Sequence, residues 1–342
     1  MKRRRICVVV LAFLLVFALP GIIFAKGEKE SSTEPGDEQY RIGMAVCTLG
    51  EAFWEATVTG ARNAADDVGV ELIVQSAQNN MNEQIQQIEN FIAQEVDAII
   101  CAPVDVFAIL ESVKKCNEAG IPFIFNTRVT LSSDDAKVDY GVGWNMQELA
   151  GIGAQKLVDV AKENNTKVNV IEVLGALTDS HTLYCRDGFA SVVEKNPEYI
   201  EVVTQVPGDW VPDKALSGTT NALKAHPEAN CIYFHSDFYF PAIESSLKQV
   251  NRWKKIGEEG HVHIICPGGE KQTLDAMKDS YVDYILVFPN LETGDLSVRK
   301  TVELLDGKTF SDDYYLMTSY VLSPENFDEK SSSVYGYVWS PK

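Results

Sequence analysis

The chain has 342 residues, with 49 acidic and 30 basic side chains, so its formal net charge is −19. A surface this acidic repels phosphate backbones, which argues against nucleic-acid binding, and it is typical of soluble proteins that resist association. The length is sufficient for two domains of ordinary size. Apart from the N-terminal segment, no apolar run approaches membrane-spanning length.

Residues 1–25 are predicted to form a secretory signal peptide. Four basic residues at positions 2–5 precede an apolar run at residues 6–19, and a Pro-Gly pair interrupts the run before Ala25, the expected cleavage site. A membrane anchor is the alternative, because the run approaches the roughly 20 residues that span a bilayer. Residues 26–39 are polar and are expected to form a flexible leader. Cleavage would leave an exported, periplasmic chain with a net charge of −23, because the four basic residues leave with the signal.

Six cysteines remain after the signal. They are Cys47, Cys101, Cys116, Cys185, Cys231 and Cys266. None forms a CxxC pair and four lie in or beside apolar strands, so we expect small buried hydrophobic residues rather than zinc ligands. A disulfide between two of them stays open as an alternative for an exported protein.

Strands and helices alternate along the first half of the chain. The expected strands are residues 41–47, 71–75, 98–101, 121–125 and 138–142. A helix opens at about Phe53 and Trp54, and further helices are expected at residues 82–94 and 110–119.

The same alternation restarts near Asn145 with a long helix at residues 146–162. The expected strands are then residues 167–174, 199–205, 231–234, 262–266, 282–287 and 314–321, with helices at 182–194, 212–225, 242–252, 271–278 and 291–305. This order predicts an α/β fold of right-handed, doubly wound parallel sheets. Because one sheet with this many strands would be unusually wide, two sheets of about five or six strands are expected.

Open α/β sheets bind ligands at the loops that follow the carboxyl ends of their strands. The candidate ligand-binding residues in such loops are Thr48, Glu51, Phe53, Trp54, Asn126, Arg128, Trp210, Ser236, Asp237 and Glu270. Aromatic rings can cover the C–H faces of a ligand while planar polar groups bind its hydroxyls, so this combination favours a neutral sugar or polyol.

Each candidate also has a structural interpretation. Only one of the adjacent rings of Phe53 and Trp54 can point fully inward from a helix, and the other would pack in the core. Arg128 also fits an ordinary solvated loop arginine, and the Ser236-Asp237 pair also fits a helix N-cap. His181 is expected at the surface.

Catalytic signatures are missing from the sequence, which contains no HExxH, GxSxG or phosphate-loop motif. Gly141-Val142-Gly143 has two glycines of a dinucleotide turn, but Met146 stands where the third should be. His261 and His263 alternate on one strand face, yet no acidic or cysteine partner is apparent, which favours a solvated strand edge over a metal site. We therefore expect no enzymatic activity, no cofactor and no metal.

Five stretches of the chain carry a family resemblance, namely Cys47-Thr48-Leu49 with Phe53-Trp54, Ser76-Ala77-Gln78-Asn79-Asn80, Ala119-Gly120-Ile121-Pro122-Phe123, Arg186-Asp187-Gly188-Phe189 and Ala225-His226-Pro227-Glu228. They resemble the type I periplasmic substrate-binding proteins, above all their ribose-binding branch, with some similarity to the autoinducer-2 receptor. The resemblance extends from Tyr40 to about Val321.

The resemblance implies two Rossmann-like lobes joined by a three-segment hinge, with the ligand enclosed between them. The expected N-terminal lobe comprises residues 40–143 and 289–319, and the C-terminal lobe comprises residues 144–288 and 320–342. It further implies that Phe53 and Trp54 stack on a sugar ring. Arg128 would grip ring hydroxyls, and Trp210 would supply a ring from the second lobe.

Several positions depart from the ribose-binding pattern. Thr127 and Gly268 each stand where the family has Asp, Phe288 stands where it has Gln, and Leu183 and Cys185 stand where it has Arg. The loss of these hydroxyl ligands disfavours ribose itself.

Glu51, Glu270 or His235 are candidates to compensate for the lost ligands. The expected function is a monomeric exported protein that delivers a monosaccharide or polyol to the membrane permease of an ABC transporter. The alternative is a periplasmic sensory receptor that reports its ligand to a membrane partner.

Overall fold

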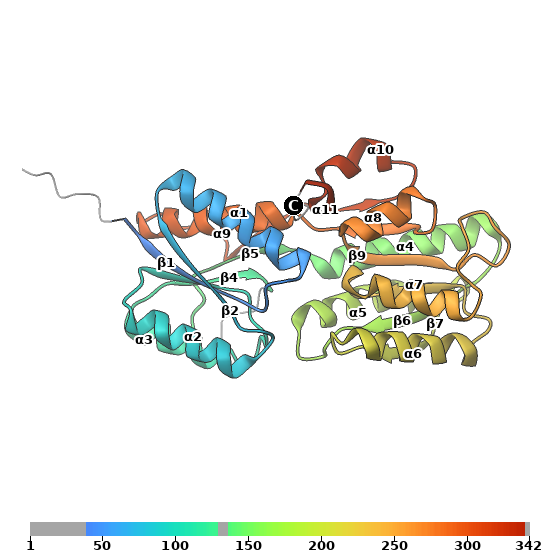
Figure 1. Ribbon diagram of the computed structural model, residues 1–342, viewed down its shortest axis with the longest axis horizontal. Helices are drawn as coiled ribbons and strands as arrows, with labels where there is room; N and C mark the ends of the chain where they lie inside the picture. Colours follow the sequence, from blue (N-terminus) through green and yellow to red (C-terminus); the bar gives the residue numbers. More distant parts are fainter. Residues whose placement is uncertain (1–38, 129–135, 339–342) are drawn as a thin grey trace, which may run out of the picture. The chain divides into compact units, whose positions relative to one another are not determined.

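The computed structural model describes residues 39–128 and 136–338 (Figure 1). The predicted signal peptide (1–25) and all of the predicted leader except Gln39 lie outside the described residues. Among the described helices, none combines the length and apolar character needed to cross a membrane.

Six parallel strands form the first sheet, in the order β11-β5-β4-β3-β1-β2. Their bounds are β1 Arg41–Val46, β2 Glu71–Ser76, β3 Ala98–Cys101, β4 Phe123–Thr127, β5 Tyr140–Trp144 and β11 Tyr314–Met317. The buried side chains of β1 alternate, with Ile42, Met44 and Val46 in one apolar cluster and Ala45 in another. Both faces of this sheet are therefore covered, as expected for a parallel sheet.

Two pairs of helices cover these faces. They are α1 (Ala52–Val68) with α9 (Asn290–Leu305), and α2 (Met81–Ala93) with α3 (Leu110–Ala119). Gly60 of α1 and Gly294 of α9 let the first pair approach closely. A Cβ atom at Gly60 would lie 1.9 Å from the carbonyl oxygen of Leu291, and one at Gly294 would lie 1.8 Å from that of Thr57. Because no side chain fits in this space, glycine at these two positions lets α9 pack against α1 in the first layered unit, although α9 follows five of the six strands of the second sheet in the sequence.

The second sheet also has six strands, in the order β12-β10-β9-β8-β6-β7. Their bounds are β6 Val168–Leu174, β7 Ile200–Pro207, β8 Cys231–Phe234, β9 His263–Gly268, β10 Tyr284–Val287 and β12 Tyr320–Leu322. All pair in parallel except β12, which runs antiparallel to β10.

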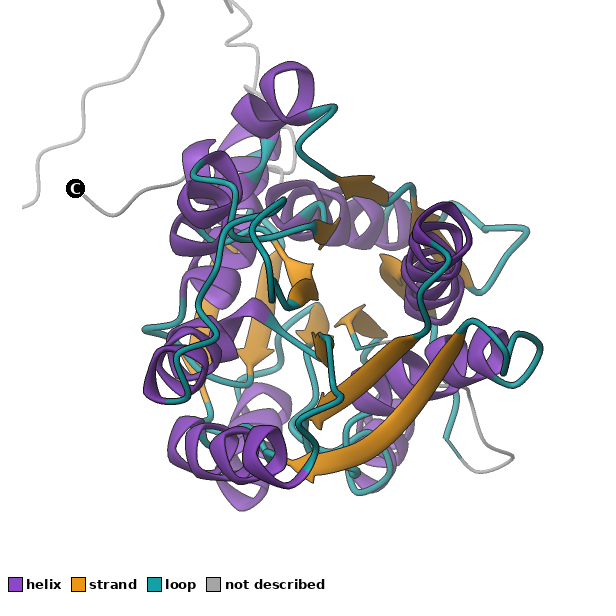
Figure 2. Cartoon of the chain, turned by 90° about the vertical axis from the view of Figure 1, so that its right-hand side faces the viewer, coloured by secondary structure: helices purple, strands orange, loops and turns teal. Residues whose placement is uncertain are grey.

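Helices lie on both faces of the second sheet (Figure 2). One face carries α4 (Met146–Asn164) and α5 (Ser180–Val193), and the other carries α6 (Pro212–Ala225), α7 (Phe240–Gln249) and α8 (Lys271–Lys278). The short helices α10 (Phe327–Lys330) and α11 (Tyr335–Val338) extend the second cluster through Phe327 and Tyr335. The predicted α/β class with two layered sheets is confirmed.

The chain passes between the two sheets three times. It leaves the first sheet after Trp144, returns after Phe288, and crosses again between Met317 and Tyr320. The single strand predicted at residues 314–321 was wrong, because β11 and β12 belong to different sheets. Thr318 and Ser319 interrupt what the sequence presents as one extended segment, and they form the third crossing.

All six cysteines outside the N-terminal segment are buried and free, as expected. Burial raises the pKa of Cys47 to about 12, even though the guanidinium of Arg128 opposes this shift. These thiols therefore stay protonated and serve as small core residues.

Candidate functional site

A cavity of about 450 Å³ lies at the carboxyl ends of the strands of both sheets. Its lining comes from the loops after β1 to β4 and after β6 to β10, namely Glu51, Phe53, Trp54, Asn79, Val104, Thr127, Arg128, Ala176, Thr178, His181, Asp209, Trp210, Val211, Ser236, Phe238, Glu270 and Phe288. This volume is within the range of about 300–1,000 Å³ that is usual for small-molecule sites.

Seven of the ten predicted site residues line this cavity. They are Glu51, Phe53, Trp54, Arg128, Trp210, Ser236 and Glu270. Phe53 and Trp54 both reach it, although they are adjacent in the sequence and only one of them was expected to face inward.

Thr48 and Asn126 do not line the cavity, because their polar groups are used inside the first layered unit. The Thr48 hydroxyl donates to the carbonyl of Leu49 at 3.1 Å. The side-chain amide of Asn126 is fully buried and donates to the Ser297 hydroxyl at 2.7 Å, and its oxygen accepts from the Thr127 hydroxyl at 2.7 Å. Asn126 therefore fastens the end of β4 to α9.

Asp237 also lies outside the lining. Its buried carboxylate accepts the backbone N–H groups of Gly269 and Glu270, both at 2.7 Å, and so holds the loop after β9. A Cβ atom at Gly268 would lie 2.0 Å from the same carboxyl group. Glycine at position 268, where the ribose branch has Asp, therefore makes room for Asp237.

Aromatic rings surround two of the three crossings between the sheets. Trp144 and Phe288, each at the end of a strand that precedes a crossing, stack with their centroids 4.5 Å apart. Phe53 packs edge-on against both, at 6.1 Å and 6.0 Å, and against Trp54 at 4.8 Å. Phe288 stands where the ribose branch has Gln, so this side of the cavity is apolar.

Arg128 is not a solvated loop arginine, because its guanidinium is nearly buried and fully engaged. It follows β4 of the first sheet and forms an ion pair of 2.7 Å with Asp179, which lies at the start of α5 against the second sheet. A second guanidinium nitrogen donates to the carbonyl of Pro103 at 3.0 Å and contacts the Cys47 sulfur at 3.1 Å. Burial is the largest single effect and lowers the pKa of Arg128, but Asp179, Cys47 and Glu51 together outweigh it, so the pKa is raised. The pair connects the loops of the two sheets.

Asp179 is a central residue that we did not include among the site residues. One of its oxygens accepts the backbone N–H of His181 at 2.9 Å, and the other accepts the indole N–H of Trp210 at 3.0 Å in addition to Arg128. The sequence placed Asp179 in the loop after the strand predicted at residues 167–174. This position alone could have marked it as a candidate site residue. Its three partners come from separate segments, so their convergence could not be read from spacing.

The expectation that His181 lies at the surface was wrong. Its side chain is partly buried and lines the cavity, and its Nε2 lies 2.8 Å from the carbonyl oxygen of His235, to which it donates. Burial lowers the pKa of His181 to about 4, so the ring is neutral near pH 7. His235, the candidate for compensation, is buried against Glu172 at 3.0 Å and does not line the cavity.

Trp210 is held from three sides. Its backbone N–H donates to the Tyr239 hydroxyl at 2.6 Å, its ring stacks on the Tyr239 ring at 5.6 Å, and its indole N–H is bound by Asp179. A Cβ atom at Gly175 would lie 2.1 Å from the indole ring, so the loop after β6 also fits closely against it. The ring is therefore positioned before any ligand arrives.

Three carboxyl groups line the cavity, those of Glu51, Asp209 and Glu270. Burial raises the pKa of both Glu51 and Glu270, and the nearby carboxylate of Asp237 raises that of Glu270 further. Asp237 is stabilised as an anion by the two backbone N–H groups that it accepts, so a proton shared by this pair resides on Glu270. Glu270 can then donate a hydrogen bond to a ligand.

Comparison with known proteins gives consistent results. The sequence model of the family described as periplasmic binding protein domain matches residues 42–309. The ribose import binding protein RbsB of Bacillus subtilis is 25% identical over 277 residues, which cover 81% of this chain and 85% of that protein. A xylitol-binding protein of Mycolicibacterium smegmatis is 24% identical over 292 residues, which cover 85% of this chain and 78% of that protein.

Solved structures show the same fold. The structure of an ABC transporter solute binding protein from Bacillus halodurans with bound myo-inositol superimposes with a TM-score of 0.75 at 24% identity. The superposition covers 86% of this chain and 98% of that one.

Proposed function

Because the chain belongs to the periplasmic binding protein domain family, we propose that it is the exported solute-binding protein of an ABC import system for a monosaccharide or polyol. The names of its relatives support this class of ligand, since they include ribose and xylitol binding proteins. In this proposal the chain works as a monomer, binds its ligand, releases it unchanged and passes it to a membrane permease.

The observation that carries the proposal is the composition of the cavity wall. The rings of Trp54 and Trp210, from the two layered units, line the same cavity as Glu51, Glu270 and Ser236. Rings cover the C–H faces of a sugar, and carboxyl and hydroxyl groups bind its hydroxyls. The cavity volume of about 450 Å³ is sufficient for a monosaccharide.

The charge of the cavity favours a neutral ligand over an anion. Arg128 is the only basic residue in the described lining, and its charge is already paired with Asp179. Glu51 adds an acidic group and Asp209 is already paired with Lys214, so a phosphorylated or carboxylated sugar would meet no unpaired cation in this lining.

The apolar side of the cavity further restricts which ligands can bind. Phe53 and Phe288 lie where the chain crosses between the sheets, and neither can replace the hydrogen bonds of a Gln side chain. A ligand hydroxyl against these rings would be desolvated without a partner, at a cost of about 1–3 kcal/mol. The ligand edge that faces them therefore carries C–H groups, as in a deoxy sugar or the ring face of a cyclitol.

Closure around the ligand would use the hinge formed by the three crossings. The pair of Arg128 and Asp179 joins the loops of the two sheets at the cavity wall. A rotation about the crossings would separate this pair and open the cavity, as in hinge motions of other two-lobed binding proteins.

Two measurements test the proposal. The protein is purified from its native host compartment without refolding, denatured, and the released small molecules are identified by mass spectrometry. Ligand-free protein is then screened by thermal shift against pentoses, hexoses, deoxy sugars and polyols. A ligand at 100 times its Kd should stabilise the native state by about 2.7 kcal/mol. A screen in which no sugar or polyol raises the Tm, with release of a compound of another class, would refute the proposal.

A further inference from the structure

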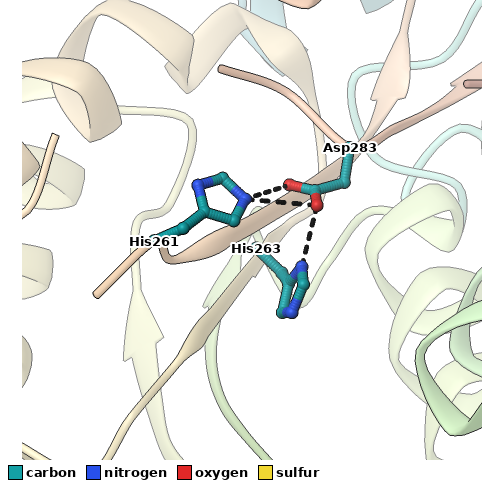
Figure 3. Close-up of side chains that lie close together, drawn as sticks. All are labelled: His261, His263 and Asp283. Atoms are coloured by element: carbon teal, nitrogen blue, oxygen red, sulfur yellow. Dashed lines mark hydrogen bonds and ion pairs between the residues drawn. The ribbon is translucent and has the colours of Figure 1, made fainter. Parts of the chain in front are cut away.

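Two histidines and one aspartate converge on the second sheet at the ends of the strands opposite to the cavity (Figure 3). His263 is the first residue of β9, His261 lies two residues before it in the preceding loop, and Asp283 comes just before β10. Nε2 of His261 lies 3.0 Å and 3.2 Å from the two Asp283 carboxylate oxygens, and Nδ1 of His263 lies 2.8 Å from one of them. One ligand atom from each residue lies within 4.8 Å of those of the other two.

The hydrogen bonds of His261 imply that its Nε2 binds either a proton or a cation. Its Nδ1 lies 2.9 Å from the carbonyl oxygen of Lys254, which can only accept, so Nδ1 carries a proton. Nε2 faces a carboxylate, which also only accepts. A neutral His261 would therefore direct a lone pair at the Asp283 anion. The contact requires either a second proton on the ring or a cation bound between the two side chains.

The surroundings resemble the supporting contacts of a protein metal site. Metal-binding histidines usually donate their second ring N–H to a carbonyl or carboxylate, as His261 does to Lys254. The Asp283 carboxylate is buried and oriented by the backbone N–H of Ile264 at 2.9 Å. His263 is partly exposed, and both histidines line a surface cavity of about 480 Å³ through which an ion and water can enter.

We propose that His261, His263 and Asp283 form a binding site for a divalent transition metal of the zinc class. Two imidazole nitrogens and one carboxylate oxygen are a ligand set that zinc accepts, with water as the fourth ligand. Bonds of about 2.0–2.1 Å in a tetrahedron place ligand atoms about 3.3 Å apart. The nitrogen–oxygen distances of 2.8–3.2 Å would widen by a few tenths of an ångström, and the two imidazoles would move toward each other.

The site would stabilise the second sheet rather than take part in ligand binding. His263 and Gly268 are the two ends of β9, which at about 3.3 Å per residue separates the site from the cavity loops by about 17 Å. A metal here would join β9 to β10 and fix the preceding loop through His261. Zinc is therefore expected to raise the Tm and to leave the affinity for the transported solute unchanged.

The test uses untagged full-length mature protein that has been treated with a chelator and exchanged into metal-free buffer. Zinc is titrated by calorimetry, and cobalt is added as a spectroscopic probe of coordination geometry. The test variants are His263→Ala and, in case this substitution disturbs folding, His263→Gln. The matched control is His226→Ala, because His226 pairs with a single carboxylate, Glu228, at 3.0 Å on the surface.

The expected result is one zinc ion per chain, visible-region cobalt bands typical of tetrahedral coordination, and a higher Tm with zinc. Loss of a supporting contact costs about 10–100-fold in metal affinity, so loss of a direct ligand should weaken zinc binding by about 100-fold or more. The control variant should bind zinc like the wild type. The proposal is overturned if the wild type binds no stoichiometric zinc, or if folded His263 variants bind it as tightly as the wild type. In that outcome the cluster is an imidazolium–carboxylate pair only.

Discussion

The ion pair of Arg128 and Asp179 should govern closure of the cavity, and a double-mutant cycle can measure its contribution. The substitutions are Arg128→Met, Asp179→Asn and the two together. The 2.7 Å contact is 12% exposed on the arginine side and 1% exposed on the aspartate side, so closing the hinge removes both charges from water. Opening restores their hydration, which means that the pair contributes to the closed state and not to the folding of either layered unit.

The size of the effect follows from the partners that remain. Removing one member of a buried ion pair typically costs about 3–5 kcal/mol, because the other charge stays buried. Asp179 keeps two donors after loss of the arginine, the backbone N–H of His181 and the indole N–H of Trp210. The expected loss for Arg128→Met is therefore about 2–3 kcal/mol, since a single hydrogen bond to a charged group contributes about 1.5–3 kcal/mol. This corresponds to roughly 30–150-fold weaker solute binding.

Calorimetric titration with the identified solute gives the affinities, and small-angle X-ray scattering of the ligand-free variants reports closure. The single variants should scatter as more open molecules than the wild type. The control is Arg299→Met, because Arg299 pairs with Asp67 and Asp295 within the first layered unit and not across the hinge. It should leave both measurements unchanged.

The cycle separates closure from direct contact with the solute, since Arg128 also lines the cavity. If the pair acts as a unit, the two single effects do not add, and the coupling energy should be about 0.5–3 kcal/mol. Additive effects, with unchanged scattering in all variants, would refute the reasoning and would assign Arg128 to the solute alone.

Three further predictions concern the charges and the glycine beside the cavity. Glu270 has a raised pKa, so its stabilising protonated form is lost as pH rises from about 4.3 through the folded-state value. The Tm of Glu270→Gln minus that of the wild type should therefore increase as the pH rises from 5 to 9. Parallel curves of Tm against pH for the two proteins would contradict this. His181 has its pKa lowered to about 4, so stability should fall as pH drops from about 6.5 to 4, by at most about 3 kcal/mol in urea denaturation. His181→Gln, whose amide can still donate to His235, should flatten that slope, and an unchanged slope would assign it to other groups. Gly268→Asp should destabilise the protein by about 3 kcal/mol in urea denaturation through collision with Asp237. The control is Gly257→Asp, because Gly257 also has a positive φ but lies in open space, and its expected loss of stability is about 1 kcal/mol. Equal losses of stability in the two variants would refute the collision.

The elements of both sheets were predictable because their sequence signals are local. The strand predicted at residues 98–101 coincides with β3, and the helix at 110–119 coincides with α3. The segment at 314–321 failed because Tyr314 to Val321 is continuously compatible with extended backbone. Only the positions of β5 and β10, the neighbours of β11 and β12, show that it must cross between sheets.

Charged clusters were less predictable than single site residues, because their members come from strands and helices distant in sequence. Asp283 is 20 residues from His263, and they meet because β9 and β10 are neighbours in the sheet. The sequence alone therefore gave His263 no acidic partner. Arg128 and Asp179 likewise lie in loops that follow strands of different sheets, so the charge of Arg128 was assigned to the ligand or to solvent.

The departures from the ribose-binding pattern form a consistent set once the contacts are known. Gly268 accommodates the Asp237 carboxylate, which holds the loop that bears Glu270. Phe288 completes the stack with Trp144 at the crossings and removes a polar group from that side of the cavity. Compared with the ribose-binding pattern, this cavity therefore offers fewer hydrogen-bonding groups on the hinge side, and Glu270 offers one on the loop after β9. The solute that we propose for this cavity therefore has its hydroxyls on one edge and C–H groups on the other, which would distinguish it from ribose.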